Sequence, residues 1–114
     1  MKIRCTQDSI RLRVRKSDIA LLAKGQKVAE ILHFPTGNTL IFTLEIGPVE
    51  RLQVQYKEAS LAVHLPERIA QNWINTEQVG IEDTLGQLHL LIEKDFPCAH
   101  RPHENKADTF EELA

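Results

Sequence analysis

The sequence predicts an α+β fold of mainly antiparallel strands: a curled sheet or small barrel built from two ββαββ pseudo-repeats with two short helices. Short runs of alternating apolar and polar residues predict the strands, and two stretches with apolar residues at i, i+3 and i+4 predict the helices. The chain has 114 residues, of which 42% are hydrophobic and 26% charged. This composition matches one globular domain that is long enough to bury its own core.

Residues 1–15 predict a β-hairpin with a basic outer face. The apolar positions of its two runs are Ile3, Cys5, Ile10, Leu12 and Val14, on either side of a turn at residues 6–9. Cations occupy the alternate positions, namely Lys2, Arg4, Arg11, Arg13 and Arg15. Because side chains alternate between the two faces of a strand, these five cations are expected on one face.

A short helix is expected after the hairpin, and a second one begins near Pro66. Ser17 is a good N-cap, Asp18 suits the first turn, and Gly25 is placed to end the first helix. Pro66 suits position N1 of the second helix, whose apolar stripe is Ile69, Ala70, Trp73 and Ile74. The remaining strands are expected at residues 28–34, 40–46, 52–56, 61–65, 79–81 and 88–92.

The order of elements suggests an internal duplication. Ile19 and Ala20 in the first helix correspond to Ile69 and Ala70 in the second, an offset of about 50 residues, which indicates a repeat. We therefore expect one domain over residues 1–96, with pseudo-repeats at about 1–47 and 48–96. The polar residues 97–114 are expected to form an extended C-terminal tail.

The formal net charge of −2 hides a strong asymmetry between the halves. Residues 1–57 hold 10 Lys and Arg against 5 Asp and Glu, whereas residues 58–114 hold 4 against 11. The chain has no apolar run near the roughly 20 residues that span a bilayer, and its basic start lacks the apolar region of a signal peptide. We expect a cytoplasmic protein with no membrane partner, in which Cys5 and Cys98 are free thiols.

The second half contains Leu61-Ala-Val-His-Leu-Pro66-Glu67, then Val79-Gly-Ile-Glu82 and Gly86-Gln-Leu-His-Leu-Leu-Ile92. A strand that ends in Leu-Pro-Glu, followed by a helix and a hairpin, resembles the swapped-hairpin units of AbrB/MazE-like DNA-binding proteins. The resemblance implies that two such units interlock into one barrel, here from a single chain. The second unit departs from that family because its helix and hairpin are acidic rather than basic.

A wider resemblance rests on Lys2-Ile-Arg4, Ser9-Ile-Arg-Leu-Arg13 and Glu93-Lys-Asp-Phe96, with Cys98, Arg101 and Ala107-Asp-Thr-Phe110 near the end. Together these segments resemble a family of short, uncharacterised bacterial proteins known only as a domain of unknown function. The resemblance implies a bacterial origin and a compact single domain, and it implies no activity.

The basic hairpin is the main candidate binding site. Five close cations repel one another unless something neutralises them. The acidic residues available for this are Glu93, Asp95, Asp108, Glu111 and Glu112, and arginine binds carboxylates in a bidentate manner. The favoured function is therefore a non-enzymatic binding or interaction module in which this hairpin pairs with the acidic C-terminal segment. The alternative is a nucleic-acid or anion binder that uses Arg11, Arg13 and Arg15.

A second candidate site combines Cys98, His100 and His103, which are all zinc-ligand types. Their spacing is not that of a common structural zinc site, so no cofactor is expected and zinc remains the alternative. Cys98 could also act as a nucleophile beside the histidines, although no oxyanion-hole glycine motif stands nearby. The sequence thus favours a protein partner over nucleic acid, allows a homodimer, and leans away from an enzyme.

Overall fold

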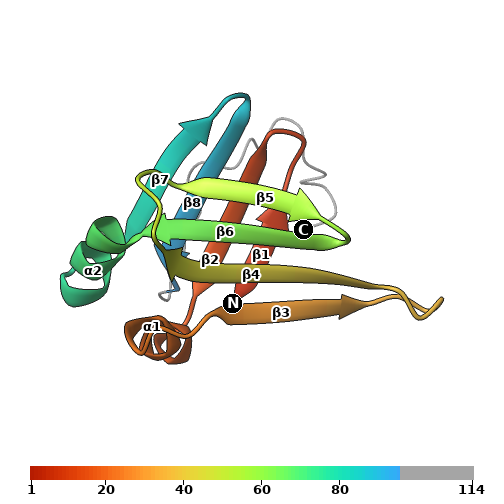
Figure 1. Ribbon diagram of the computed structural model, residues 1–114, viewed down its shortest axis with the longest axis horizontal. Helices are drawn as coiled ribbons and strands as arrows, with labels where there is room; N and C mark the ends of the chain where they lie inside the picture. Colours follow the sequence, from red (N-terminus) through yellow and green to blue (C-terminus); the bar gives the residue numbers. More distant parts are fainter. Residues whose placement is uncertain (96–114) are drawn as a thin grey trace, which may run out of the picture.

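The computed structural model describes residues 1–95 as two four-stranded sheets and two short helices (Figure 1). The first half contains β1 (Lys2–Cys5), β2 (Ser9–Val14), α1 (Lys16–Ala23), β3 (Val28–His33) and β4 (Thr39–Gly47). The second half contains β5 (Gln53–Lys57), β6 (Ser60–Pro66), α2 (Glu67–Asn75), β7 (Gly80–Leu85) and β8 (Leu88–Lys94). The expected tail at residues 97–114 falls outside the described residues.

Each sheet joins one hairpin from each half of the chain. The first sheet has the strand order β1-β2-β8-β7 and the second has β3-β4-β6-β5. Strands within a hairpin are antiparallel, whereas the two central pairs, β2 with β8 and β4 with β6, are parallel. The N-terminal hairpin therefore lies beside the last strand of the second half, and this neighbour completes the candidate site.

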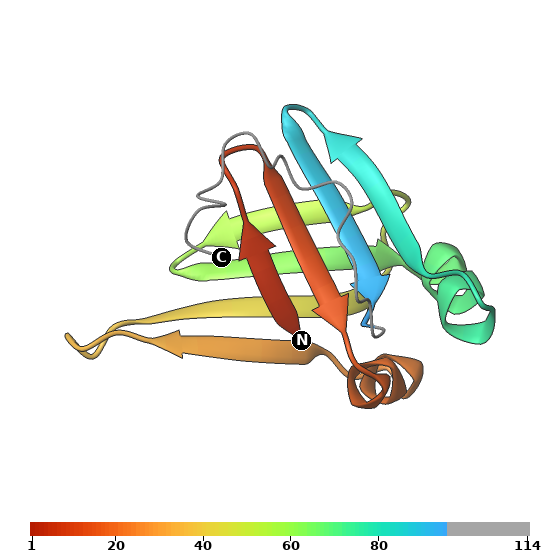
Figure 2. The same cartoon turned by 180° about the vertical axis from the view of Figure 1, so that it is seen from behind.

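The core lies between the two sheets, whose strands cross one another (Figures 1 and 2). The alternate apolar residues predicted for β2 face inward, and Leu12 and Val14 are each 1% exposed. The second sheet supplies Leu44, Val63 and Leu65. The helices lie at the same end of both sheets, where α1 buries Leu22 and α2 buries Trp73. The indole N–H of Trp73 donates to the Val79 carbonyl at 3.0 Å, so its polar group is satisfied.

The predicted α+β class and the hairpins are confirmed, but the two sheets do not close into a barrel. The prediction of a helix N-cap at Ser17 was wrong, because α1 begins at Lys16 with Arg15 as the N-cap. Similarly, Pro66 is the N-cap of α2 rather than its first residue. Gly25 follows the end of α1 with φ of +77°, as expected for a glycine terminator. Neither helix within residues 1–95 is long and apolar enough to cross a membrane.

Candidate functional site: a basic face on the first sheet

Four of the five predicted cations share the outer face of the N-terminal hairpin. In the antiparallel register of β1 and β2, Lys2 lies opposite Arg13 and Arg4 lies opposite Arg11. The inward positions of β2 are apolar and buried, and Ile3 on β1 is partly buried against the core, which fixes the register and directs the charged side chains outward. We call Lys2, Arg4, Arg11 and Arg13, with the carboxylates that contact them, the basic face.

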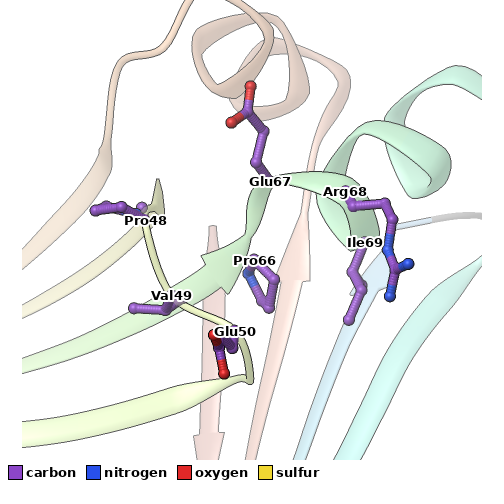
Figure 3. Close-up of a pocket in the computed structure, with 8 residues that line it drawn as sticks. Pro48, Val49, Glu50, Pro66, Glu67, Arg68 and Ile69 are labelled. Atoms are coloured by element: carbon purple, nitrogen blue, oxygen red, sulfur yellow. The ribbon is translucent and has the colours of Figure 1, made fainter.

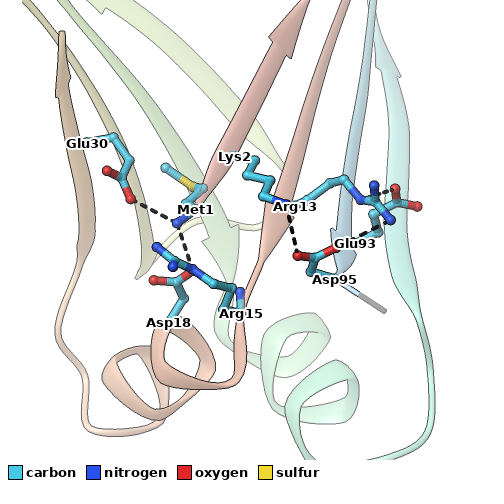
Figure 4. Close-up of polar contacts among 8 residues, drawn as sticks. All are labelled: Met1, Lys2, Arg13, Arg15, Asp18, Glu30, Glu93 and Asp95. Carbon is cyan, nitrogen blue, oxygen red and sulfur yellow. Dashed lines mark hydrogen bonds and ion pairs between the residues drawn. The ribbon is translucent and has the colours of Figure 1, made fainter. Parts of the chain in front are cut away.

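Two carboxylates at the end of β8 hold three of these cations, and Figure 4 shows two of the three, Lys2 and Arg13. Glu93 lies directly beside Arg13 in the parallel register. Its Oε1 accepts a hydrogen bond from Arg11 Nε at 2.8 Å and lies 3.3 Å from Arg13 Nε. Asp95 completes the group, with its two oxygens each 3.5 Å from a cation, Arg13 Nη2 and Lys2 Nζ. The ion pairs of Arg11 and Arg13 thus join the basic first half to the acidic second half.

The basic face still carries an excess of positive charge. Its four cations and two carboxylates give +4 − 2 = +2. The side chain of Arg13 is largely buried, at 14% exposure, whereas that of Lys2 is 70% exposed. Arg4 is exposed and makes no ion pair with any of residues 1–95. Lys2, Ile3, Arg4, Arg11 and Arg13 line a shallow hollow of about 190 Å³, which provides room for a small anionic group.

Arg15, the fifth predicted cation, lies apart from the others at the start of α1. Its backbone N–H donates to Asp18 Oδ2 at 2.9 Å. The cations of the basic face are therefore the four on β1 and β2, in place of the five expected from the sequence.

A second charged cluster surrounds the Met1 ammonium, which lies 3.0 Å from Asp18 Oδ2 and 2.8 Å from Glu30 Oε1 (Figure 4). Burial lowers the pKa of this ammonium, but the hydrogen bonds and charges of Glu30 and Asp18 outweigh it and raise the pKa above 8.0. Burial likewise raises the pKa of Asp18, yet the Arg15 N–H and the ammonium bring it below 3.8. Sequence reasoning missed this cluster, because no local pattern reveals that Met1 is buried.

The proposed metal or thiol site at Cys98, His100 and His103 lies outside the described residues. Cys5, the one free cysteine within residues 1–95, is exposed at the end of β1. In this part of the chain no three His, Cys, Asp or Glu residues gather in a way that could hold a metal ion. The Nε2 atom of His64 lies 2.7 Å from Glu45 on the outer face of the second sheet, so this half-buried histidine pairs with one carboxylate.

A larger hollow of about 570 Å³ lies where the β4–β5 connection meets the start of α2 (Figure 3). Pro48, Val49, Glu50, Pro66 and Glu67 are among its lining residues. The carboxylates of Glu50 and Glu67 point in opposite directions, and the Arg68 side chain extends away from both. These polar groups do not point toward one place where a ligand could sit, so this hollow is a weaker candidate binding site than the basic face.

Comparison with known families assigns nearly the whole chain to one family. Residues 1–113 match the family of unknown function DUF7009. The chain belongs to this family. The match confirms the prediction of a domain-of-unknown-function family, while the bacterial origin and the AbrB/MazE-like resemblance gain no support from it. No curated protein sequence matches the chain, so the function has to be argued from the site.

Proposed function

We propose that this protein is a non-enzymatic binding module whose basic face takes the carboxylates of an acidic peptide segment. The observation that carries the proposal is the residual charge of +2 on a face where Glu93 already holds Arg11 in place. An arginine with a fixed orientation loses little side-chain entropy when it binds a second carboxylate. Arg4 and Lys2 remain available to the incoming group because both are exposed.

The first acidic segment to consider is part of the same chain. Residues 104–114 hold four acidic side chains and one lysine, a net charge of −3. The last described residue, Asp95, contacts Lys2 and Arg13 on the basic face. Residues 104–114 begin nine positions after Asp95 in the sequence, and a short tether gives an effective concentration of about millimolar. Charge complementarity and this tether support binding of the acidic C-terminal segment to the basic face of the same chain.

The test compares the full chain with a truncation after residue 96. We expect the truncation to melt at a lower temperature, and to bind a synthetic peptide of residues 97–114 with an affinity that falls as salt rises. Arg4→Gln should weaken this binding several-fold without changing the fold. Arg51→Gln provides the matched control, since Arg51 is exposed in the β4–β5 connection, away from the face. A truncation with unchanged melting temperature that does not bind the peptide would contradict the proposal.

Nucleic acid is the second candidate, because the residual positive charge is exposed. Specific duplex binders neutralise many phosphates, commonly about 6–10, whereas this face has a net charge of +2 from residues 1–95. A small anionic group suits the face better than a duplex does. Retention of duplex DNA by the truncation with a steep salt dependence, and without peptide binding, would favour nucleic acid instead.

A further inference from the structure

Of the six exposed large hydrophobic residues within residues 1–95, three lie along the free edge of the second sheet. β3 is the outermost strand of that sheet, and no other described element lies beyond it (Figures 1 and 2). Ile31 is 53% exposed, Leu32 51% and Phe34, just after the strand, 44%. Ile31 and Leu32 project from opposite faces, so apolar surface is exposed on both sides of a strand whose outer edge has no partner within residues 1–95. An extended strand with apolar residues on both faces would cover it.

β3 differs from the other edge strands in lacking charges that discourage pairing. Such charges are the usual protection of a free edge. β1 carries Lys2 and Arg4, β5 carries Lys57, and β7 carries Glu82 and Asp83. Glu30 is the one Asp, Glu, Lys or Arg of β3, and its carboxylate already binds the Met1 ammonium.

The hydrogen-bond register of β3 fits a second copy of itself. The Phe34 N–H donates to the Asn38 carbonyl, and hydrogen-bonded pairs alternate along an antiparallel ladder. In the register with β4, the even-numbered residues of β3 therefore bond within the sheet. The backbone groups of Ala29, Ile31 and His33 point away from β4, toward the free edge. This set is symmetric about Ile31, as a two-fold axis requires.

From this symmetry we infer that two copies of the chain associate through antiparallel pairing of their β3 strands, with the two-fold axis at Ile31. Ala29 of each copy lies opposite His33 of the other, and the two second sheets join into one continuous sheet. The two Ile31 side chains pack against each other, and the exposed Leu32 side chains gain cover on the opposite face. A two-fold contact uses the same surface on both copies and closes without further growth.

Sedimentation velocity across the micromolar range tests the inference on the full chain. The wild type should shift from monomer to dimer as concentration rises. Ile31→Lys places two like charges opposite each other and should raise the dissociation constant by about tenfold or more. Tyr56→Lys is the matched control, since Tyr56 is 69% exposed on β5, the other edge of the same sheet, and it should dimerise like the wild type.

Amide hydrogen exchange gives a residue-level readout that also reports on folding. The amides of Ala29, Ile31 and His33 should exchange slowly in the dimer and rapidly in Ile31→Lys. The even-numbered amides of β3 should stay protected in both proteins, which shows that the variant is folded. A wild type that stays monomeric, or a variant that dimerises normally, would overturn the inference. Protection that appears only after an extended apolar peptide is added would also overturn it, in favour of a foreign strand.

Discussion

Substitution of Glu93 by Gln should lower stability and raise affinity for acidic peptides at the same time. The Glu93 carboxylate is largely buried, at 10% exposure, and contacts both Arg11 and Arg13. A hydrogen bond to a charged group contributes about 1 kcal/mol more than a neutral one. Loss of the charge also leaves two half-buried guanidinium groups with less compensation. We therefore expect a loss of about 1–3 kcal/mol in the free energy of unfolding, or roughly 5–15 °C in melting temperature.

The same substitution, Glu93→Gln, should strengthen the binding of an acidic peptide although it lowers stability. Removal of one negative charge raises the net charge of the basic face from +2 to +3. A bound carboxylate about 6 Å away gains about 0.7 kcal/mol at the dielectric constant of water, which is a threefold increase in affinity. Chemical denaturation measures the first effect, and titration of the truncation with the peptide of residues 97–114 measures the second.

The control for Glu93→Gln is Glu82→Gln, a carboxylate on β7 that is 66% exposed and lies 3.4 Å from His89. This control should change neither quantity much, because exposed ion pairs contribute little. If Glu93→Gln left stability unchanged, or if affinity fell together with stability, the argument from net charge would be refuted.

Three other substitutions test separate parts of the structure. Asp18→Asn should cost about 1–3 kcal/mol near neutral pH, measured by denaturation at several pH values. The raised pKa of Met1 means that its stabilisation is complete below pH 8.0 and lost as pH rises through the folded-state pKa. The lowered pKa of Asp18 means that its stabilisation is complete above pH 3.8 and lost as pH falls through its folded-state pKa. Asp18→Asn should abolish the loss of stability at acidic pH and reduce the loss at alkaline pH, which Glu30 still supports. An unchanged pH dependence at both ends would exclude the pair of Met1 and Asp18 as its source. Trp73→Ala should cost about 3–5 kcal/mol in urea denaturation, because the indole is fully buried and bonded to Val79, and a cost under 1 kcal/mol would argue against its place in the core. In the truncation after residue 96, Arg4→Gln should leave the melting temperature within about 2 °C of that of the unsubstituted truncation, whereas a clear loss would show that Arg4 has a structural partner within residues 1–96.

Local patterns in the sequence were sufficient to predict the hairpins. Alternation between buried and exposed positions in β2 gives its register as well as its existence, because a slip by one residue would expose Leu12 and bury Arg11. Gly37 has φ of +93° in the β3–β4 turn, as a glycine in such a turn suggests. The strand expected at residues 79–81 extends to Leu85 in β7, since an edge strand tolerates the acidic residues Glu82 and Asp83.

The sequence predicted that Glu93 and Asp95 neutralise the N-terminal hairpin, but it did not reveal that β2 and β8 pair as parallel strands. The parallel pairing of β2 with β8 joins residues 80 positions apart, such as Ser9 and His89. No local preference encodes such a contact, because it depends on how the two sheets bury their faces together. The duplication stays a prediction as well, although α1 buries Leu22 and α2 buries Trp73 at an offset of 51 residues.

The charge asymmetry and this exchange of hairpins are two aspects of one arrangement. Had each half formed a sheet of its own, the N-terminal hairpin would pair with β3 and β4, whose charged residues are Glu30 and Glu45. The exchange instead places β8 beside β2, so that Glu93 and Asp95 arrive at Arg11 and Arg13. Those two carboxylates neutralise half of the positive charge and leave a net charge of +2 on a face where Lys2 and Arg4 are exposed. A face that is partly neutralised stays folded with its arginines already oriented, and keeps enough charge to attract a further acidic group.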